Sequence, residues 1–179
     1  MLKLMFVFAA LAGCAVDSSP EVVTYERTIV TIGAAGPTIS TETVTADQQR
    51  EEVAARDEAR ANPDAISPYV QVSGCWNGGA LWMYDQPNYT GNQLCVIDPG
   101  WDSLANYWRS TCSGMTCFVG TWSGAIRSYY GGEQDFYFAV QDNGTWNYTP
   151  LFNQYSHETV ADGLTPRATV FGLVDHHYY

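Results

Sequence analysis

The stretch that decides the fold is Trp82–Gln93, which reads WMYDQPNYTGNQ. Tyr84 is followed after four residues by a second aromatic residue, Tyr89, and Gly91 comes two positions later. This spacing predicts a hairpin that folds back over its own sheet, with the Tyr84 ring packed across the turn. Glycine suits position 91 because a side chain there would collide with the hairpin or because the backbone needs a positive φ.

Short β-like runs lie around this hairpin and are separated by Gly, Asn and Asp residues, which predicts an all-β domain over residues 67–179, either a sandwich or a barrel. The aromatic residues support this boundary, since 22 of the 25 lie between Ser67 and the C-terminus, including all six tryptophans. The expected strands are Tyr69–Val72, Ala80–Tyr84, Gln93–Ile97, Thr116–Thr121, Ala125–Tyr130, Phe136–Gln141 and Ala168–Val174.

Two further segments accompany the hairpin: Asp102–Leu104 followed by Tyr107 and Trp108, and then Ile126–Ser128. With the hairpin, they resemble the Greek-key motif of the βγ-crystallin family, and the resemblance covers Leu81–Ser128. It implies a Greek-key β-sandwich in which Ser128, on the closing strand, hydrogen-bonds back to the folded hairpin. It also implies a second motif within Gly131–Asp175, opened by Phe136–Phe138 and closed by Arg167–Val170. No second aromatic-x4-aromatic-x-Gly occurs there, so this half is expected to be degenerate or differently folded.

Four cysteines, Cys75, Cys95, Cys112 and Cys117, lie in the aromatic-rich part of the chain. An even number suits two disulfides in an exported protein, and Cys75–Cys95 with Cys112–Cys117 is one of three possible pairings. Metal ligation by these thiols is the alternative, which their spacing disfavours.

The fifth cysteine, Cys14, ends the sequence Leu11-Ala12-Gly13-Cys14, which follows Lys3 and the apolar run Leu4–Leu11. Residues 1–14 resemble a bacterial lipoprotein signal peptide with its lipobox, which implies lipid attachment at the Cys14 thiol. The apolar run is too short to span a bilayer as a helix. Cleavage after Ala12, with secretion of a soluble protein, is the alternative.

Residues 15–66 form a polar segment that is expected to be a stalk or a flexible linker. Val22–Ile32 alternates weakly as a strand would, and the segment holds too few apolar side chains to offset the entropy of ordering it. A helix is predicted over 46–61, because Thr45 and Gln48 form a capping box and Asn62-Pro63 ends it. Val53 is its only large apolar residue, so we expect the helix to stand in solvent.

The charge balance excludes one class of partner. Eight basic and 19 acidic residues give a net charge of −11, and the basic residues are scattered, so no phosphate-binding surface for nucleic acid is expected. The common nucleotide-binding, zinc-protease and serine-hydrolase motifs are absent from the sequence, and no catalytic residue is predicted. Carboxylate pairs such as Asp98 with Asp102, or Glu133 with Asp135, could serve acid–base chemistry, but turn-rich β domains place Asp in such loops for backbone capping, and this role is assigned to them.

The βγ-crystallin resemblance also raises calcium, which many microbial members bind through an acidic pair followed by Ser or Thr residues. The matching run here is Ser123–Ser128, where the acidic pair is absent and Arg127 stands at a ligand position. Because a hard cation needs several converging oxygen ligands, calcium binding is disfavoured and no cofactor is expected.

Aromatic side chains are the candidates for binding. Trp101, Trp108, Trp122 and Trp146 lie in or beside turns rich in Gly and Asn, where exposed rings could stack on a sugar or enter a partner's pocket. We therefore expect a non-enzymatic lipoprotein, anchored through Cys14 in the outer membrane or at the cell surface, that binds an unknown protein or glycan or serves a structural role. A secreted protease inhibitor or toxin-like effector, acting through the loop between Cys112 and Cys117, is the alternative.

Overall fold

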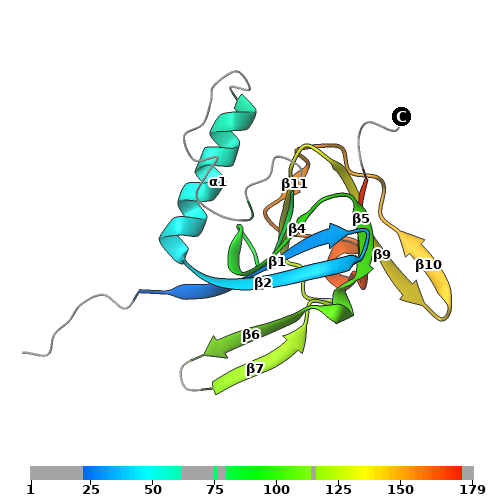
Figure 1. The fold of residues 1–179 in the computed structure, drawn as a ribbon, viewed down its shortest axis with the longest axis horizontal. Helices are drawn as coiled ribbons and strands as arrows, with labels where there is room; N and C mark the ends of the chain where they lie inside the picture. The colour runs from blue at the N-terminus through cyan, green and yellow to red at the C-terminus, as the bar shows by residue number, and fades with distance from the viewer. Residues whose placement is uncertain (1–21, 62–74, 76–79, 114–115, 175–179) are drawn as a thin grey trace, which may run out of the picture.

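A computed structural model describes residues 22–61, 75, 80–113 and 116–174. Within these residues the chain forms twelve strands in three sheets and one α-helix, so the protein is mostly β (Figure 1). The six-stranded sheet has the order β11 (His157–Glu158), β8 (Ser128–Gly131), β3 (Leu81–Gln86), β4 (Thr90–Ile97), β1 (Thr24–Gly33) and β2 (Gly36–Thr45). The four-stranded sheet has the order β10 (Thr145–Tyr148), β9 (Asp135–Asp142), β12 (Val170–Val174) and β5 (Gly100–Ser103).

The remaining elements are small. β6 (Trp108–Ser113) and β7 (Thr116–Thr121) pair only with each other, and this hairpin extends from the two larger sheets (Figure 1). Two 3-10 helices, η2 (Leu104–Asn106) and η3 (Thr165–Arg167), connect strands. The predicted strand Tyr69–Val72 lies outside the described residues.

The two large sheets exchange strands. β8, β3 and β4 are neighbours in one sheet, but β5, which follows β4 in the chain, pairs with β12 of the other sheet. The second half repeats this order: β12, β9 and β10 are neighbours, and β11 crosses back to pair with β8. Each half is a four-strand unit in which the fourth strand returns beside the first and the third strand joins the opposite sheet.

The second half reaches this order without a folded-over hairpin. β9 and β10 are joined by the two-residue turn Asn143–Gly144, whose φ values of 50° and 80° are both positive. Such a turn matches the twist of the flanking strands directly. The second unit therefore needs no aromatic-x4-aromatic-x-Gly sequence, although Phe136–Phe138 opens it on β9 as predicted.

The main core lies between the two large sheets. Alternate residues of β3 and β4 face the four-stranded sheet, whose own inward side chains are aromatic or aliphatic. This cluster includes Leu81, Met83, Leu94, Val96, Tyr129, Phe136, Phe138, Phe171 and Leu173.

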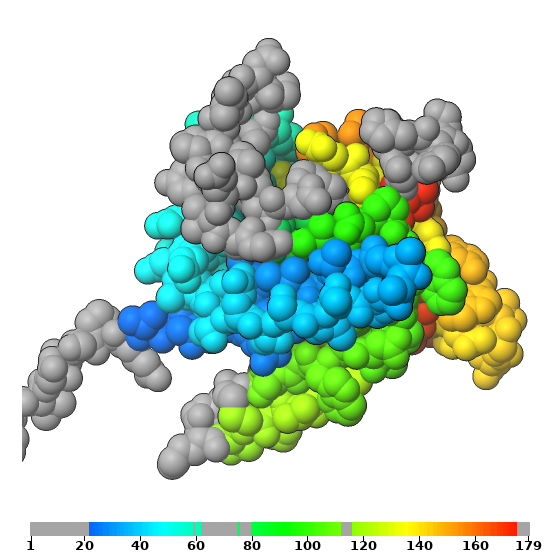
Figure 2. Space-filling model, in the orientation of Figure 1, coloured from blue at the N-terminus to red at the C-terminus, as the bar shows by residue number. Residues whose placement is uncertain are grey.

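The N-terminal polar segment is part of this architecture. β1 and β2 form an antiparallel hairpin, and β1 pairs in parallel with β4 from Arg27 opposite Gln93 to Thr31 opposite Ile97. The hairpin, in blue, crosses the near face of the molecule (Figure 2). The prediction of a stalk or flexible linker is therefore wrong for residues 24–61, because β1 and β2 extend the six-stranded sheet and the helix that follows them has buried residues.

The helix α1 (Ala46–Ala61) has the predicted bounds. Its capping box is formed, since the Thr45 N–H donates to Gln48 Oε1 at 2.7 Å and the Gln48 N–H donates to Thr45 Oγ1 at 3.1 Å. The expectation that it stands in solvent is wrong. Gln49, Ala55 and Arg56 are buried.

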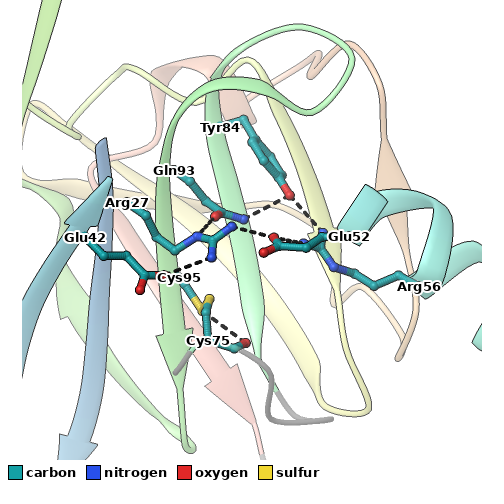
Figure 3. Close-up of a disulfide and its surroundings, with 8 residues drawn as sticks. All are labelled: Arg27, Glu42, Glu52, Arg56, Cys75, Tyr84, Gln93 and Cys95. Atoms are coloured by element: carbon teal, nitrogen blue, oxygen red, sulfur yellow. Dashed lines mark hydrogen bonds and ion pairs between the residues drawn. A yellow bond between two sulfur atoms is a disulfide. The ribbon is translucent and has the colours of Figure 1, made fainter. Parts of the chain in front are cut away.

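Two arginines bury their charge beneath this helix. Arg27, on β1, pairs with Glu42 of β2 at 2.9 Å and with Glu52 of the helix, while Arg56 pairs with Glu52 at 3.4 Å (Figure 3). The Arg56 guanidinium also lies 4.3 Å from the centre of the Trp82 ring. Two positive and two negative charges balance, as burial of charge requires.

One disulfide is defined, and it agrees with one of the three possible pairings of the four cysteines. Cys75 and Cys95 form one, with their Cα atoms 6.0 Å apart, on the sheet face that the helix covers. Cys117 is disulfide-bonded, and the β6–β7 register places Cys112 opposite to it.

Candidate functional site

Ser128 ties the closing strand to the hairpin from which the fold was predicted. Its side-chain oxygen accepts from the Tyr89 N–H at 3.0 Å and donates to the Gln86 carbonyl at 2.7 Å. Gly91 has a φ of +86°, and a Cβ there would lie 2.3 Å from Asp85 Oδ1. Both reasons given for glycine at this position therefore apply.

The Tyr84 ring is arranged differently from the prediction in one respect. It meets the Tyr89 ring edge-on, with centroids 5.8 Å apart, and so packs against the turn. The atoms nearest to Gly91, however, belong to Asp85 and Gln86. The Tyr84 hydroxyl points under the helix, where it accepts from Gln93 Nε2 at 3.0 Å and from Arg56 Nη1 at 2.8 Å.

The residues that match a calcium-binding run do not fit that ion. Arg127 Nη1 donates to the carbonyls of Gly124 at 3.1 Å, Ile126 at 3.0 Å and Pro166 at 3.4 Å. The guanidinium thus occupies the carbonyl oxygens that a cation would use. No group of three or more His, Cys, Asp or Glu side chains able to hold a metal occurs among the described residues.

The carboxylates considered for acid–base chemistry serve the backbone and its neighbours. Asp102 accepts from the Ser103 N–H at 2.6 Å and from the Tyr107 hydroxyl at 2.6 Å. Asp135 accepts from the Gln154 N–H at 2.9 Å. The bonds to the Ser103 and Gln154 N–H groups are backbone caps of the kind expected for Asp in turn-rich β domains, while Asp102 also holds the Tyr107 side chain.

The structure separates the four tryptophans predicted to bind. Trp122 is fully buried in the main core, so the prediction that it binds a ligand is wrong. Trp108 is 64% exposed but lies on the isolated β6–β7 hairpin. Trp101 and Trp146 lie on the two edge strands of the four-stranded sheet, β5 and β10, and line the same groove.

This aromatic groove lies on the outer face of the four-stranded sheet and has a volume of about 310 Å³. Strand register places its residues on one face, since Trp101 is opposite Gly172, Tyr148 opposite Ala139 and Trp146 opposite Gln141. The lining residues are Trp101, Tyr137, Ala139, Trp146, Tyr148 and Val170.

Sequence comparison gives this groove no precedent. No protein-family model matches the chain, and no curated protein is significantly similar to it in sequence.

The walls of the groove are aromatic and its floor is made of small residues. Ala139 and Val170 lie at the centre, and the Tyr137 ring lies so close to Gly172 that a Cβ there would be 2.2 Å from it. Trp101, Trp146 and Tyr148 are 70%, 43% and 57% exposed. Since monomers seldom expose several large aromatic side chains on one face without a use for them, this groove is the main candidate site.

The groove has hydroxyl groups but no formal charge. Its lining, as far as the structure describes it, contains no Asp, Glu, Lys, Arg or His. Burial, together with the neighbouring Tyr148, raises the pKa of Tyr137, so this hydroxyl stays protonated at neutral pH. The sequence indicated Trp101 and Trp146, but it missed Tyr137 and Tyr148. Tyr137 alternates with the buried Phe136 and Phe138 on β9, and Tyr148 follows Trp146 by two residues on β10, so the period of two is the signal that could have found them.

A second exposed surface is the β6–β7 hairpin. Phe118 and Val119 are each 69% exposed, and the adjacent Cys117 is disulfide-bonded. Arg109 is the only charged residue between Trp108 and Thr121, and it pairs with Asp85 at 2.8 Å. In the part of the chain that the structure covers, no helix is long and apolar enough to cross a bilayer.

Proposed function

We propose that this protein is an exported lipoprotein with a βγ-crystallin-like domain that acts as a non-catalytic binding module at the cell envelope. The aromatic groove on the outer face of the four-stranded sheet carries the proposal. Its exposed rings and hydroxyl groups suit binding, and the described residues that line it include no nucleophile paired with a general base.

The fold assignment draws on the strand exchange and on Ser128. A Greek-key unit with its third strand in the facing sheet occurs twice, and Ser128 bonds to both sides of the folded hairpin, as the family resemblance implies. Fold alone does not determine function, so the proposed binding role depends on the groove.

The anchor depends on the sequence, because Cys14 lies outside the described residues. Lipid on this thiol would retain the protein in the membrane fraction, and intact-mass measurement would show the added acyl chains. Cys14→Ser is expected to release the protein from that fraction. An unmodified chain in the culture supernatant would remove the anchor from the proposal.

Binding is tested with the full chain in detergent. Isolated envelope fragments should retain the parent protein, and a Trp101→Ala, Trp146→Ala variant should be retained much less. Trp108→Ala is the matched control, because this tryptophan is 64% exposed but lies outside the groove. Equal retention of all three proteins would refute a binding role for the groove.

The β6–β7 hairpin supports a second candidate, a protease inhibitor or toxin-like effector. Its exposed Phe118 and Val119 beside a disulfide form the kind of rigid apolar segment that enters a partner's pocket. Inhibition assays with metalloproteases and serine proteases test this. Inhibition that persists in a Cys112→Ser, Cys117→Ser variant would exclude the hairpin loop as its cause.

A further inference from the structure

We propose that the aromatic groove binds a neutral pyranose glycan, with sugar rings lying flat on Trp101 and Trp146. This inference rests on the proposed binding function and names the class of ligand. Glucose and N-acetylglucosamine units in β-linked chains each have a face made of C–H bonds and an edge of hydroxyl groups, which together match the two kinds of surface in the groove.

Charge separates a glycan from the other ligands that stack on aromatic rings. Single-stranded nucleic acid also stacks on such rings, but its binding needs a positively charged groove that follows the backbone. Here the lining contains no basic residue, and the chain carries a net charge of −11. Acidic polysaccharides are disfavoured for the same reason, so the ligand is an uncharged chain.

Ring orientation separates a glycan from a proline-rich peptide. Peptides of that kind also dock into aromatic-lined grooves, so the arrangement of the rings has to distinguish the two ligands. Within this groove, Trp146 and Tyr148 are alternate residues of β10, with ring centroids 6.4 Å apart and planes inclined by 32°. They form a nearly continuous shelf, with the two rings side by side, and a shelf suits flat stacking of successive sugar units.

Hydroxyl groups supply the polar contacts. The Tyr137 and Tyr148 rings meet edge-on at 5.8 Å, at the end of the shelf, and their hydroxyls can both donate and accept. Gln141, opposite Trp146 and exposed, adds an amide beside the second ring. Sugar hydroxyls need such uncharged donors and acceptors to replace the water they lose on binding.

The floor of the groove leaves space for a glycan chain. Strands in a sheet lie about 4.8 Å apart, so β5 and β10, separated by two strands, place their backbones about 14 Å apart. Between these edges Ala139 and Val170 add little bulk, and the Tyr137 ring covers Gly172. A chain of sugar rings that crosses the sheet can therefore stack on Trp101 at one edge and on the β10 shelf at the other.

The test uses the full chain in detergent with four soluble probes: cellohexaose, chitohexaose, hexagalacturonate and decaproline. Titration calorimetry and tryptophan fluorescence should both detect binding of cellohexaose or chitohexaose at millimolar concentration, with much weaker binding of the charged and peptide probes. Trp146→Ala should weaken glycan binding about tenfold, as loss of one stacked ring does elsewhere. Trp108→Ala should leave it unchanged, and thermal unfolding of each variant checks that the fold is intact.

Each result bears on the inference separately from the proposed function. If neither neutral glycan binds, the proposal of a glycan ligand is refuted. The proposed binding module would still be supported if envelope fragments retain the protein and this retention depends on Trp101 and Trp146. Tighter binding of decaproline, lost in Trp146→Ala, overturns the glycan in favour of a peptide. Glycan binding that survives both Trp101→Ala and Trp146→Ala places the sugar elsewhere and refutes the site.

Discussion

Ser128→Ala should destabilise the protein, because two backbone groups would lose their hydrogen-bond partner. The Tyr89 N–H is buried, and leaving it unsatisfied costs about 2 kcal/mol, while the carbonyl of Gln86, an exposed residue, adds about 1 kcal/mol. Asn88 and Tyr89 both have positive φ values, 59° and 58°, so the turn depends on this anchor to hold a conformation that such residues disfavour.

A loss of about 3 kcal/mol would lower the melting temperature by about 6–12 °C for a folded region of this size. Thermal and urea unfolding, followed by circular dichroism and by tryptophan fluorescence, measure it. Ser40→Ala, at an exposed position on the edge strand β2, is the matched control and should change stability by less than about 0.5 kcal/mol. If Ser128→Ala is as stable as this control, the serine does not hold the hairpin, and the assignment of the fold to the βγ-crystallin type loses its main support.

Gly91→Ala should lower the free energy of unfolding by about 3 kcal/mol, since φ is +86° and the new Cβ would meet Asp85 and Gln86. Gly144→Ala is the control: its φ is +80° but the space around it is open, so it should lose only about 1 kcal/mol. Equal urea midpoints for the two variants would contradict the clash at Gly91. Arg56→Met should lower stability by about 2 kcal/mol, because its contacts with Glu52, Trp82 and the Tyr84 hydroxyl are lost. Arg50→Met is the control: the Arg50 side chain is 72% exposed on the same helix, so this change should have little effect on the unfolding curve. Burial raises the pKa of Tyr89 to about 12, so the neutral phenol is favoured in the folded state. The stabilisation from this shift is complete below the unfolded pKa of about 10 and is lost as the pH rises to 12. Between about pH 9 and pH 11, the free energy of unfolding of Tyr89→Phe should therefore fall by about 1 kcal/mol less than that of the parent. Equal falls, measured by urea unfolding at each pH, would contradict the raised pKa.

Local signals in the sequence predicted the elements that depend on local physics. The helix over 46–61 was found from its capping box, and the hairpin at Tyr84–Gly91 was found from the spacing of its aromatic residues and glycine. The role of Ser128, which is not local, was implied by the resemblance to the βγ-crystallin motif. Strands β7 and β9 were placed to within one residue because their apolar and aromatic residues are bounded by turn residues.

The N-terminal hairpin was missed because its stability is not local. β1 carries a charged residue, Arg27, at a position that is 1% exposed, and only the carboxylates of Glu42 and Glu52 make that position tolerable. The helix, likewise, docks through Gln49, Arg56 and an alanine, so it has no apolar stripe that would reveal a buried face.

The aromatic groove was predicted only in part, again because it depends on contacts that are distant in the sequence. Composition identifies aromatic residues near turns, but burial depends on which sheet each strand joins, and so Trp122 and Trp101 look alike in sequence while one is buried and the other is 70% exposed. The exchange of β5 into the four-stranded sheet is what brings Trp101 onto the same face as Trp146.

The parallel pairing of β1 with β4 also limits how far the domain can move from a membrane. If Cys14 carries lipid, only ten residue steps separate the lipid from Thr24, where the sheet begins, and an extended chain of that length covers at most about 35 Å. A free segment up to residue 66 would have allowed about 180 Å. With lipid on Cys14, the reach of the protein would be short, and whatever it holds would itself lie within a few nanometres of the lipid surface.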